Sequence, residues 1–371
     1  MGRTKGYIGK FQIIFVYMQD LFIELLQVTV GTRDFLSRVP TSIEWQGLFN
    51  EGRRQAVECV LLAGINQLPE NQRPPKDVLL QWIGSVEMIG LRNALLNRRC
   101  VELQTLFVSS GFKSCILKGQ GNALLYPDPL LRQSGDIDIW VEGERDAIIE
   151  FLRRNKQIKH IDVKHCNWKI FKDVPVEVHF IPSWFYNPFI NKKLQNWFNN
   201  QKTVQFENKS EEGFNTPTVS FNMVYVLIHI YRHLFDEGIG LRQLMDYYYI
   251  LLHSTAEERQ EVKIVLDSFK MKHFVSAVMY VMQEVFMLDE EFLISQPLVK
   301  EGYFLLNEIM IAGNFGHYDI RRSHRNRGRW VNGIENIRRN MRFVSRYPQE
   351  VCWMPAWKIW HWCWRKRKGY L

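Results

Sequence analysis

Hydrophobic and polar positions alternate along this chain with two different periods. Apolar residues recur every three or four positions over residues 11–30, 51–64 and 76–110, which predicts helices, the last in two pieces around Gly90. The same spacing returns after residue 220. It predicts further helices over residues 221–235, 241–252, 256–269, 273–286, 300–311, 329–346 and 356–365.

Between these helical parts, residues 111 to about 181 favour short strands. We expect strands at residues 115–117, 136–141, 160–165, 167–171 and 176–181, with helices at 119–126 and 144–155. A helix at 187–201 and an extended or looped segment at 203–220 follow. The pattern predicts an α+β fold, in which a small mixed sheet with helices on one side (residues 111–220) lies between helical segments 1–110 and 221–371.

Asp136 and Asp138 stand one residue apart inside an apolar run. Alternate side chains of a strand share a face, so the two carboxylates would project together. Such a pair is tolerated when a cation lies between the carboxylates or when both are solvated. Upstream, the turn Lys118-Gly119-Gln120-Gly121 joins a strand to a helix and could bind phosphate. Together these features suggest nucleotide chemistry.

Glu177 supplies a third carboxylate on a later strand, where His179 shares its face. Phosphoryl transfer needs metal ions held on carboxylates, and Mg²⁺ prefers oxygen ligands. We expect Asp136 and Asp138 to bind metal and Glu177 to complete the site and help activate the attacking hydroxyl. The alternative is that Asp136 and Asp138 form the wet edge of an ordinary strand. His179 would orient a carboxylate, contact phosphate or be an ordinary core histidine.

Two cations lie near this motif in the sequence. Lys118 ends the first strand and Arg132 stands four residues before Asp136, so both are candidates to neutralise phosphates. Alternatively, both side chains are simply solvated.

These motifs, taken together, resemble an uncharacterised bacterial nucleotidyltransferase family of the DNA polymerase β-like superfamily. The resemblance covers roughly residues 85–355. It rests on Leu117-Lys118-Gly119, Tyr126-Pro127-Asp128-Pro129, Arg132, Gly135-Asp136-Ile137-Asp138, Val176-Glu177-Val178-His179, residues 229–235 (HIYRHLF), 238–246 (GIGLRQLMD) and 313–319 (GNFGHYD).

The resemblance implies a polymerase β-like sheet and a metal-dependent transfer of NMP from an NTP, with Mg²⁺ or Mn²⁺ as cofactor. The superfamily's metal-binding aspartates fall on Asp136 and Asp138, its third carboxylate on Glu177 and its glycine turn on Gly119. The usual Gly-Ser of that turn is replaced by Lys118-Gly119-Gln120, so no serine hydroxyl is available for phosphate. The acceptor would be a sugar phosphate, a metabolite or a protein. Many members look like products of capsular or surface-polysaccharide loci.

Two rival functions stay open on the same fold. The missing Gly-Ser favours a catalytically inactive nucleotide-binding or regulatory protein. A peripheral scaffold of a polysaccharide assembly complex is the other.

Two more groups lie in the later helices. His229 and His233 are four residues apart on one helix face, and we prefer a structural or phosphate-side role to a metal site. Arg242 and Asp246 have the same spacing and either pair with each other or face the cleft, where Arg242 would help bind substrate. The Arg-rich loop 313–329 would bind an anionic acceptor or triphosphate, or be solvated.

Charge is uneven along the chain. The 48 Lys and Arg against 39 Asp and Glu give a net charge of +9, and the surplus gathers in residues 321–371. This indicates local recognition of anions and not a uniformly basic nucleic-acid-binding protein, so no specific nucleic acid is expected. Trp353, Trp357, Trp360 and Trp364 form a helical stripe before the basic run 365–368, which indicates core packing or contact with a membrane surface.

The expected location is the cytoplasm. The six cysteines show no metal-binding spacing, which suggests a reducing compartment. No stretch is apolar enough for a membrane span, because residues 11–30 carry Asp20 and Glu24. Contact through the C-terminal helix would place the protein at the inner face of the membrane.

Overall fold

The computed structural model describes residues 19–321 and 328–370. Residues 19–29 are helical. The other helices of eight or more residues are α2 (Ser42–Gln55), α3 (Glu58–Gln67), α4 (Lys76–Ser109), α6 (Arg145–Asn155), α7 (Pro188–Glu207), α8 (Val219–Asp236), α9 (Leu241–Leu252), α10 (Ala256–Ser268), α11 (Lys272–Phe286), α12 (Val299–Ala312), α13 (Gly328–Asn340) and α15 (Met354–Lys368). Short helices are α5 (Gln120–Ala123) and α14 (Pro348–Val351).

Within residues 19–321 and 328–370, five strands form one sheet: β1 (Ser114–Ile116), β2 (Ile137–Val141), β3 (Ile158–Ile161), β4 (His165–Trp168) and β5 (Val176–His179). Their order in the sheet is β1-β2-β5-β4-β3. β2 and β5 are parallel, and every other neighbouring pair is antiparallel. The sheet is therefore mixed, and the predicted α+β fold with helical flanks is confirmed.

The two faces of the sheet differ in chemistry. Ile137, Ile139, Val176 and Val178 belong to a compact apolar core shared with the C-terminal half of α4 and with α6. Because side chains alternate along a strand, Asp138 and Glu177 project from the opposite face. That face is directed toward α8 and the C-terminal helices, whose core is much larger.

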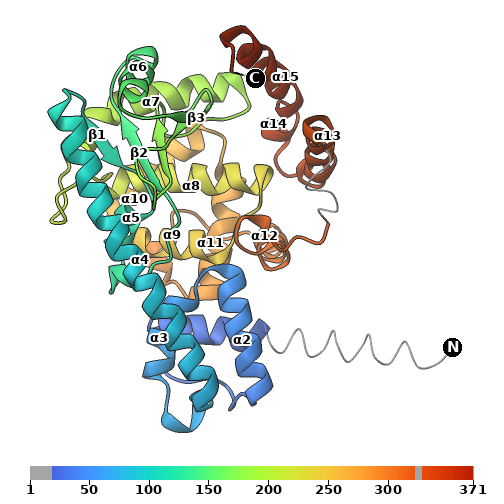
Figure 1. Ribbon diagram of the computed structural model, residues 1–371. Helices are drawn as coiled ribbons and strands as arrows, with labels where there is room; N and C mark the ends of the chain where they lie inside the picture. The colour runs from blue at the N-terminus through green and yellow to red at the C-terminus, as the bar shows by residue number, and fades with distance from the viewer. Residues whose placement is uncertain (1–18, 322–327, 371) are drawn as a thin grey trace.

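Helix α4 connects the N-terminal helices with the sheet (Figure 1). Val78 and Trp82 near its start pack into the larger core, whereas Leu103 and Phe107 near its end pack beneath the sheet. The prediction of two pieces around Gly90 is wrong, because the helix is continuous over 34 residues. Glycine costs only about 1 kcal/mol in a helix interior, so a long, well-packed helix tolerates one.

Other predicted elements also differ from the structure. The strands expected at 160–165 and 167–171 lie at Ile158–Ile161 and His165–Trp168 instead, because the chain turns between residues 161 and 165. The helix expected over residues 51–64 breaks at Ala56, which adopts a left-handed conformation (φ 56°) and caps α2. Helix α7 continues to Glu207, so residues 203–207 are helical and not extended. The helix expected over 329–346 ends at Asn340 and is followed by a 3₁₀ turn, Met341–Phe343. Periodicity alone does not show where a chain reverses direction.

Some predictions concern residues outside the described ranges. These include residues 11–18 of the first helix and 322–327 of the Arg-rich loop. Within the described part of the chain, none of the helices is both long and apolar enough to span a membrane.

Candidate active site

A cleft of about 540 Å³ opens over the polar face of the sheet. Its walls come from the end of β1, from β4 and β5, and from α8, and they include Lys118, Asp136, Glu177 and His229. A smaller recess next to it shares Lys118, Asp136 and His229 and extends to Arg242 on α9. Residues that lie up to 197 positions apart in the sequence, Lys118 and Phe315, thus line the same recess.

Three carboxylates lie together at the N-terminal ends of β2 and β5, those of Asp136, Asp138 and Glu177. Each offers a carboxylate oxygen, and the three oxygens lie within 4.8 Å of one another. The parallel register explains this, since Asp138 pairs with Glu177 and Asp136 directly precedes β2. Burial, together with the neighbouring Asp138 charge, raises the pKa of both Asp136 and Glu177. A divalent cation would offset this repulsion, so the three carboxylates fit a metal site.

Lys118 lies directly against these carboxylates. Its Nζ is 3.2 Å from Asp138 Oδ1 and 3.3 Å from His229 Nε2. Burial alone would lower the pKa of Lys118, but Asp138, Asp136 and Glu177 outweigh it and raise that pKa. Lys118 is therefore a fixed positive charge at the mouth of the turn.

Gly119 makes the turn between β1 and α5. Its φ of 62° and ψ of −113° are accessible to glycine and strongly disfavoured for other residues. Gln120 follows but does not face the cleft: it is buried and bonds through Nε2 to Asn97 Oδ1 on α4. The position where the superfamily's serine was expected is thus used to attach the turn to α4.

Arg132, which was expected to neutralise phosphate, is buried and bonded to a carboxylate. Its Nε donates to Asp246 Oδ1 at 2.7 Å and its Nη2 donates to Asp246 Oδ2 at 2.6 Å. Tyr126 Oη also donates to Asp246, at 2.7 Å. Both members of the ion pair are about 5% exposed. Asp246 therefore pairs with Arg132 across 114 positions. Of the two alternatives for Arg242 and Asp246, a hydrogen bond between them is not present among the described residues.

Arg242 faces the recess instead. Its Nη1 donates to the carbonyl oxygen of Gln133 at 2.8 Å, and its guanidinium lies 5.2 Å from the ring centroid of Phe315. Its Nε is buried with no hydrogen-bond partner among the described residues. Burial and the nearby Arg132 lower its pKa. Arg242 and Lys118 are the cations best placed to meet an anion bound at Asp136.

Two histidines border the carboxylates on the same face of the sheet. His179 Nε2 lies 2.8 Å from Asp138 Oδ1, and both His179 Nε2 and His165 Nε2 lie 3.7 Å from Glu177 Oε2. Burial alone would raise the pKa of Asp138, but Lys118 and His179 outweigh it and lower that pKa. His165 was not among the predicted site residues. Its position on a strand next to Val176–His179 was the signal that could have indicated it.

Comparison with known protein families decides the broad class. The model of a family described as "Uncharacterised nucleotidyltransferase" matches residues 41–287, which is more than half of the chain. The chain belongs to this nucleotidyltransferase family. The match includes Asp136, Asp138, Glu177 and Arg242 and supports nucleotidyl transfer as the general activity. It begins and ends earlier in the chain than the motif resemblance had indicated.

Solved structures show only distant similarity. A nucleotidyltransferase-like antigenic protein from Paracoccidioides brasiliensis is 13% identical, with a TM-score of 0.31, over 52% of this chain and 97% of that chain. A CCA-adding enzyme from Thermotoga maritima in complex with tRNA is 12% identical, with a TM-score of 0.21, over 73% of this chain and 81% of its own. A comparison with curated proteins found no match. Similarity this low does not identify a substrate.

In this member of the family, the other residues that the sequence singled out make different contacts. His233 Nδ1 lies 3.2 Å from Glu237 Oε2, and the His229 and His233 rings are 4.2 Å apart. Neither belongs to a described group of three potential metal ligands. Arg321, the one described arginine of the Arg-rich loop whose side chain is placed, is bonded to Glu308 and Asp319 and so holds the loop onto α12.

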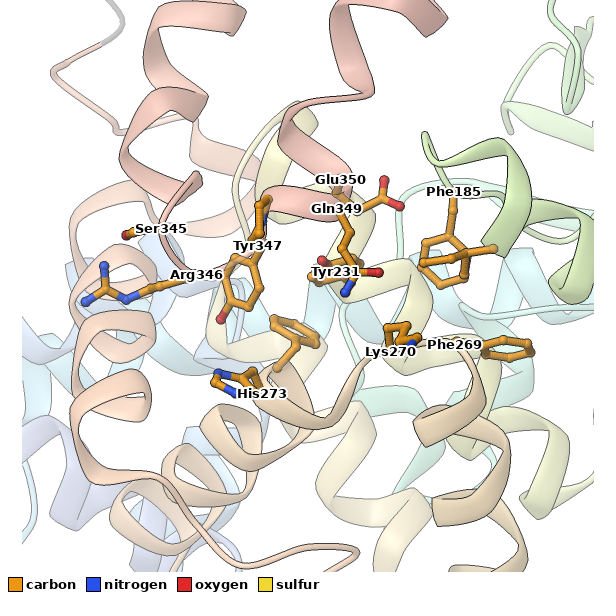
Figure 2. Close-up of a pocket in the computed structure, with 13 residues that line it drawn as sticks. Phe185, Tyr231, Phe269, Lys270, His273, Ser345, Arg346, Tyr347, Gln349 and Glu350 are labelled. Carbon is orange, nitrogen blue, oxygen red and sulfur yellow. The ribbon is translucent and has the colours of Figure 1, made fainter.

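A second cavity, of about 290 Å³, lies between α8, α11 and α14 (Figure 2). Tyr231 and Tyr347 lie in its middle, with Arg346 towards one end and Phe185 and Phe269 towards the other. Glu350 connects it with the cleft over the sheet, because its Oε2 accepts a hydrogen bond from Arg232 at 3.2 Å and Arg232 also lines that cleft. Burial raises the pKa of Glu350 to about 7.

Proposed function

We propose that this protein transfers a nucleoside monophosphate from an NTP to an acceptor, with Asp136, Asp138 and Glu177 holding Mg²⁺ or Mn²⁺. The single observation that carries the proposal is the convergence of these three carboxylates within 4.8 Å at one end of the sheet. A bound divalent ion would neutralise phosphate charge and polarise the α-phosphate. The protein's own contribution is to position the reactants and to supply cations.

The NTP would enter beside the turn at Gly119. Lys118 would leave Asp138 for the phosphates, and Arg242 would bind them from α9. The acceptor oxygen would attack the α-phosphorus, and Glu177, at the same edge of the cleft, would help to remove its proton. The bond from the α-phosphorus to the bridging oxygen would break, and pyrophosphate would leave with the electron pair. Arg132, bonded to Asp246, would position α9 and the loop before Asp136.

A basic groove supports an anionic acceptor such as a sugar phosphate. It measures about 690 Å³ and carries Lys159, Lys169 and Lys172. Asn167 lines both this groove and the catalytic cleft, and it is the cross-strand neighbour of Glu177. An acceptor whose phosphate bound the lysines could therefore direct its other end toward Glu177. Transfer to phosphorylated sugars and not to the matching free sugars would support this acceptor class; the reverse preference would refute it.

The transfer itself can be tested with labelled NTPs. The purified protein is incubated with each NTP, Mg²⁺ or Mn²⁺ and a cell lysate, and labelled products are resolved. We expect product with the wild type and none with Asp136→Asn/Asp138→Asn. Asp146→Asn is the matched control, because Asp146 is an exposed carboxylate on α6 outside the cleft. Equal labelling by the wild type and the double variant would refute the assignment.

One observation favours a second candidate, a nucleotide-binding protein without transfer activity. Lys118 and His179 both contact Asp138 Oδ1, so this carboxylate is neutralised without a metal ion. Calorimetry separates the two candidates. NTP binding that needs no divalent ion, with no product in the labelling experiment, would favour the inactive protein.

We also infer that α15 contacts the surface of an anionic membrane. Trp353, Ile359, Trp360 and Trp362 are between 37% and 67% exposed, and the basic run 365–368 ends the helix. By contrast, Trp357 of the predicted stripe stacks on Trp184. The basic end matches anionic headgroups. We expect co-sedimentation with vesicles that contain phosphatidylserine and loss of it in Trp360→Ser/Trp362→Ser; binding that is unaffected by both changes would contradict the inference.

A further inference from the structure

Two imidazole rings and one carboxylate, all potential metal ligands, lie together on the polar face of the sheet. His165 on β4 pairs with His179 on β5, and Glu177 stands two residues before His179. All three side chains share one face of two adjacent antiparallel strands. One ligand atom from each lies within 4.8 Å of those from the other two. Regular strands hold such a group with little freedom to rearrange, which suits a preformed site.

The donor atoms of each histidine and Glu177 are slightly farther apart than ligands of one metal ion. His165 Nε2 and His179 Nε2 each lie 3.7 Å from Glu177 Oε2. Ligands bonded to one ion at about 2.0–2.1 Å lie about 3.0–3.4 Å apart, so each donor would move inward by only a few tenths of an ångström. His179 Nε2 and Asp138 Oδ1, 2.8 Å apart, are already at the separation of two neighbouring ligands.

The orientation of the rings supports ligation through Nε2. His165 and His179 are 8% and 5% exposed, and the Nδ1 atom of each is buried with no hydrogen-bond partner in the described part of the chain. In the metal-free protein His179 Nε2 donates to Asp138 Oδ1, and on metal binding the proton of each neutral ring would lie on Nδ1, which leaves the Nε2 lone pair for the ion.

We propose that His165, Glu177 and His179 form a binding site for a divalent transition-metal ion such as Mn²⁺ or Zn²⁺. Imidazole nitrogen favours these ions, whereas Mg²⁺ prefers oxygen ligands alone. This site goes beyond the proposed nucleotidyl transfer and does not depend on it, because the ion is held by these three side chains whatever the acceptor. Glu177 belongs to both this site and the carboxylate site, so an ion here lies next to the one held by Asp136 and Asp138.

The test measures metal binding and not activity. Chelator-treated full-length protein is titrated with Mn²⁺ alone and with Zn²⁺ alone, and the Mn²⁺-loaded protein is examined by pulsed electron paramagnetic resonance. We expect modulation from directly bound imidazole nitrogen. We expect His165→Gln/His179→Gln to abolish that modulation and to weaken Zn²⁺ binding on the order of 100-fold.

Two variants keep the result interpretable. His160→Gln removes another histidine of the same cleft and should leave the nitrogen signal and Zn²⁺ affinity unchanged. Asp136→Asn should weaken Mg²⁺ binding and retain the nitrogen signal. Absence of the signal in the wild type, or its persistence in the folded double variant, would overturn the proposal. Neither result would bear on the proposed nucleotidyl transfer, which the labelled-NTP experiment tests separately.

Discussion

Arg132 and Asp246 form a buried, bidentate ion pair that joins the loop before β2 to helix α9. The two hydrogen bonds measure 2.7 and 2.6 Å, and Tyr126 Oη donates a third to the same carboxylate. This pair fixes Arg242, one turn earlier on α9, over the recess that contains Asp136. Arg132 is thus held in a structural ion pair, whereas Arg242 faces the recess.

The buried pair should be essential for stability. Replacing Asp246 with Asn leaves the Arg132 charge buried without its carboxylate, which costs about 3–5 kcal/mol in comparable cases. We expect that loss in the free energy of unfolding, measured by chemical denaturation. Glu44→Gln, which removes a more exposed partner of Arg38, should cost about 1 kcal/mol or less. Equal losses for the two variants would contradict the role given to Asp246.

Arg242 should affect nucleotide binding and not stability. A hydrogen bond to a charged group contributes about 1.5–3 kcal/mol, so Arg242→Gln should weaken NTP binding by roughly 10- to 100-fold. Calorimetry gives the affinity and a thermal melt gives the stability. Arg53→Gln, an exposed arginine on α2, should change neither. Unaltered NTP affinity in Arg242→Gln would remove Arg242 from the site.

Metal binding should strengthen as pH rises. Folding raises the pKa of Asp136 and Glu177, so protons compete with metal at these carboxylates in the folded protein. Without metal, the same shift means that these two groups favour the folded state most at low pH, and that this contribution is lost as pH rises through their folded pKa values. The increase in melting temperature caused by Mg²⁺ should therefore grow between acidic and neutral pH. A pH-independent increase would contradict this.

Gly119 should not tolerate a side chain. Its φ of 62° and ψ of −113° are strained for alanine, so Gly119→Ala should cost about 1–3 kcal/mol and displace Lys118. Gly90→Ala is the matched control. It lies inside α4, where an added Cβ meets nothing within 4 Å, and should stabilise the protein by about 0.5–1 kcal/mol. A stable Gly119→Ala protein with normal NTP affinity would show that the turn is not constrained.

Local patterns predicted those parts of the site that depend on one strand at a time. The alternation at Val176–His179 placed Glu177 and His179 on one face, and the spacing of Asp136 and Asp138 indicated a shared cation. Long-range pairings left no local signal. Asp246 bonds Arg132 and not Arg242, since the direction of a side chain on α9 depends on how that helix packs. His165 lies in the site because β4 pairs with β5 in the sheet, and periodicity does not determine which strands are neighbours.

The most direct test of the account is a crystal structure of the protein soaked with Mn²⁺ and a non-hydrolysable NTP. We predict an anomalous peak for Mn²⁺ bound by carboxylate oxygens of Asp136, Asp138 and Glu177. The α-phosphate should contact the same ion, with Lys118 and Arg242 on the phosphates. Nucleotide bound elsewhere, or Lys118 still bonded to Asp138 with no ion at the three carboxylates, would contradict the proposed function.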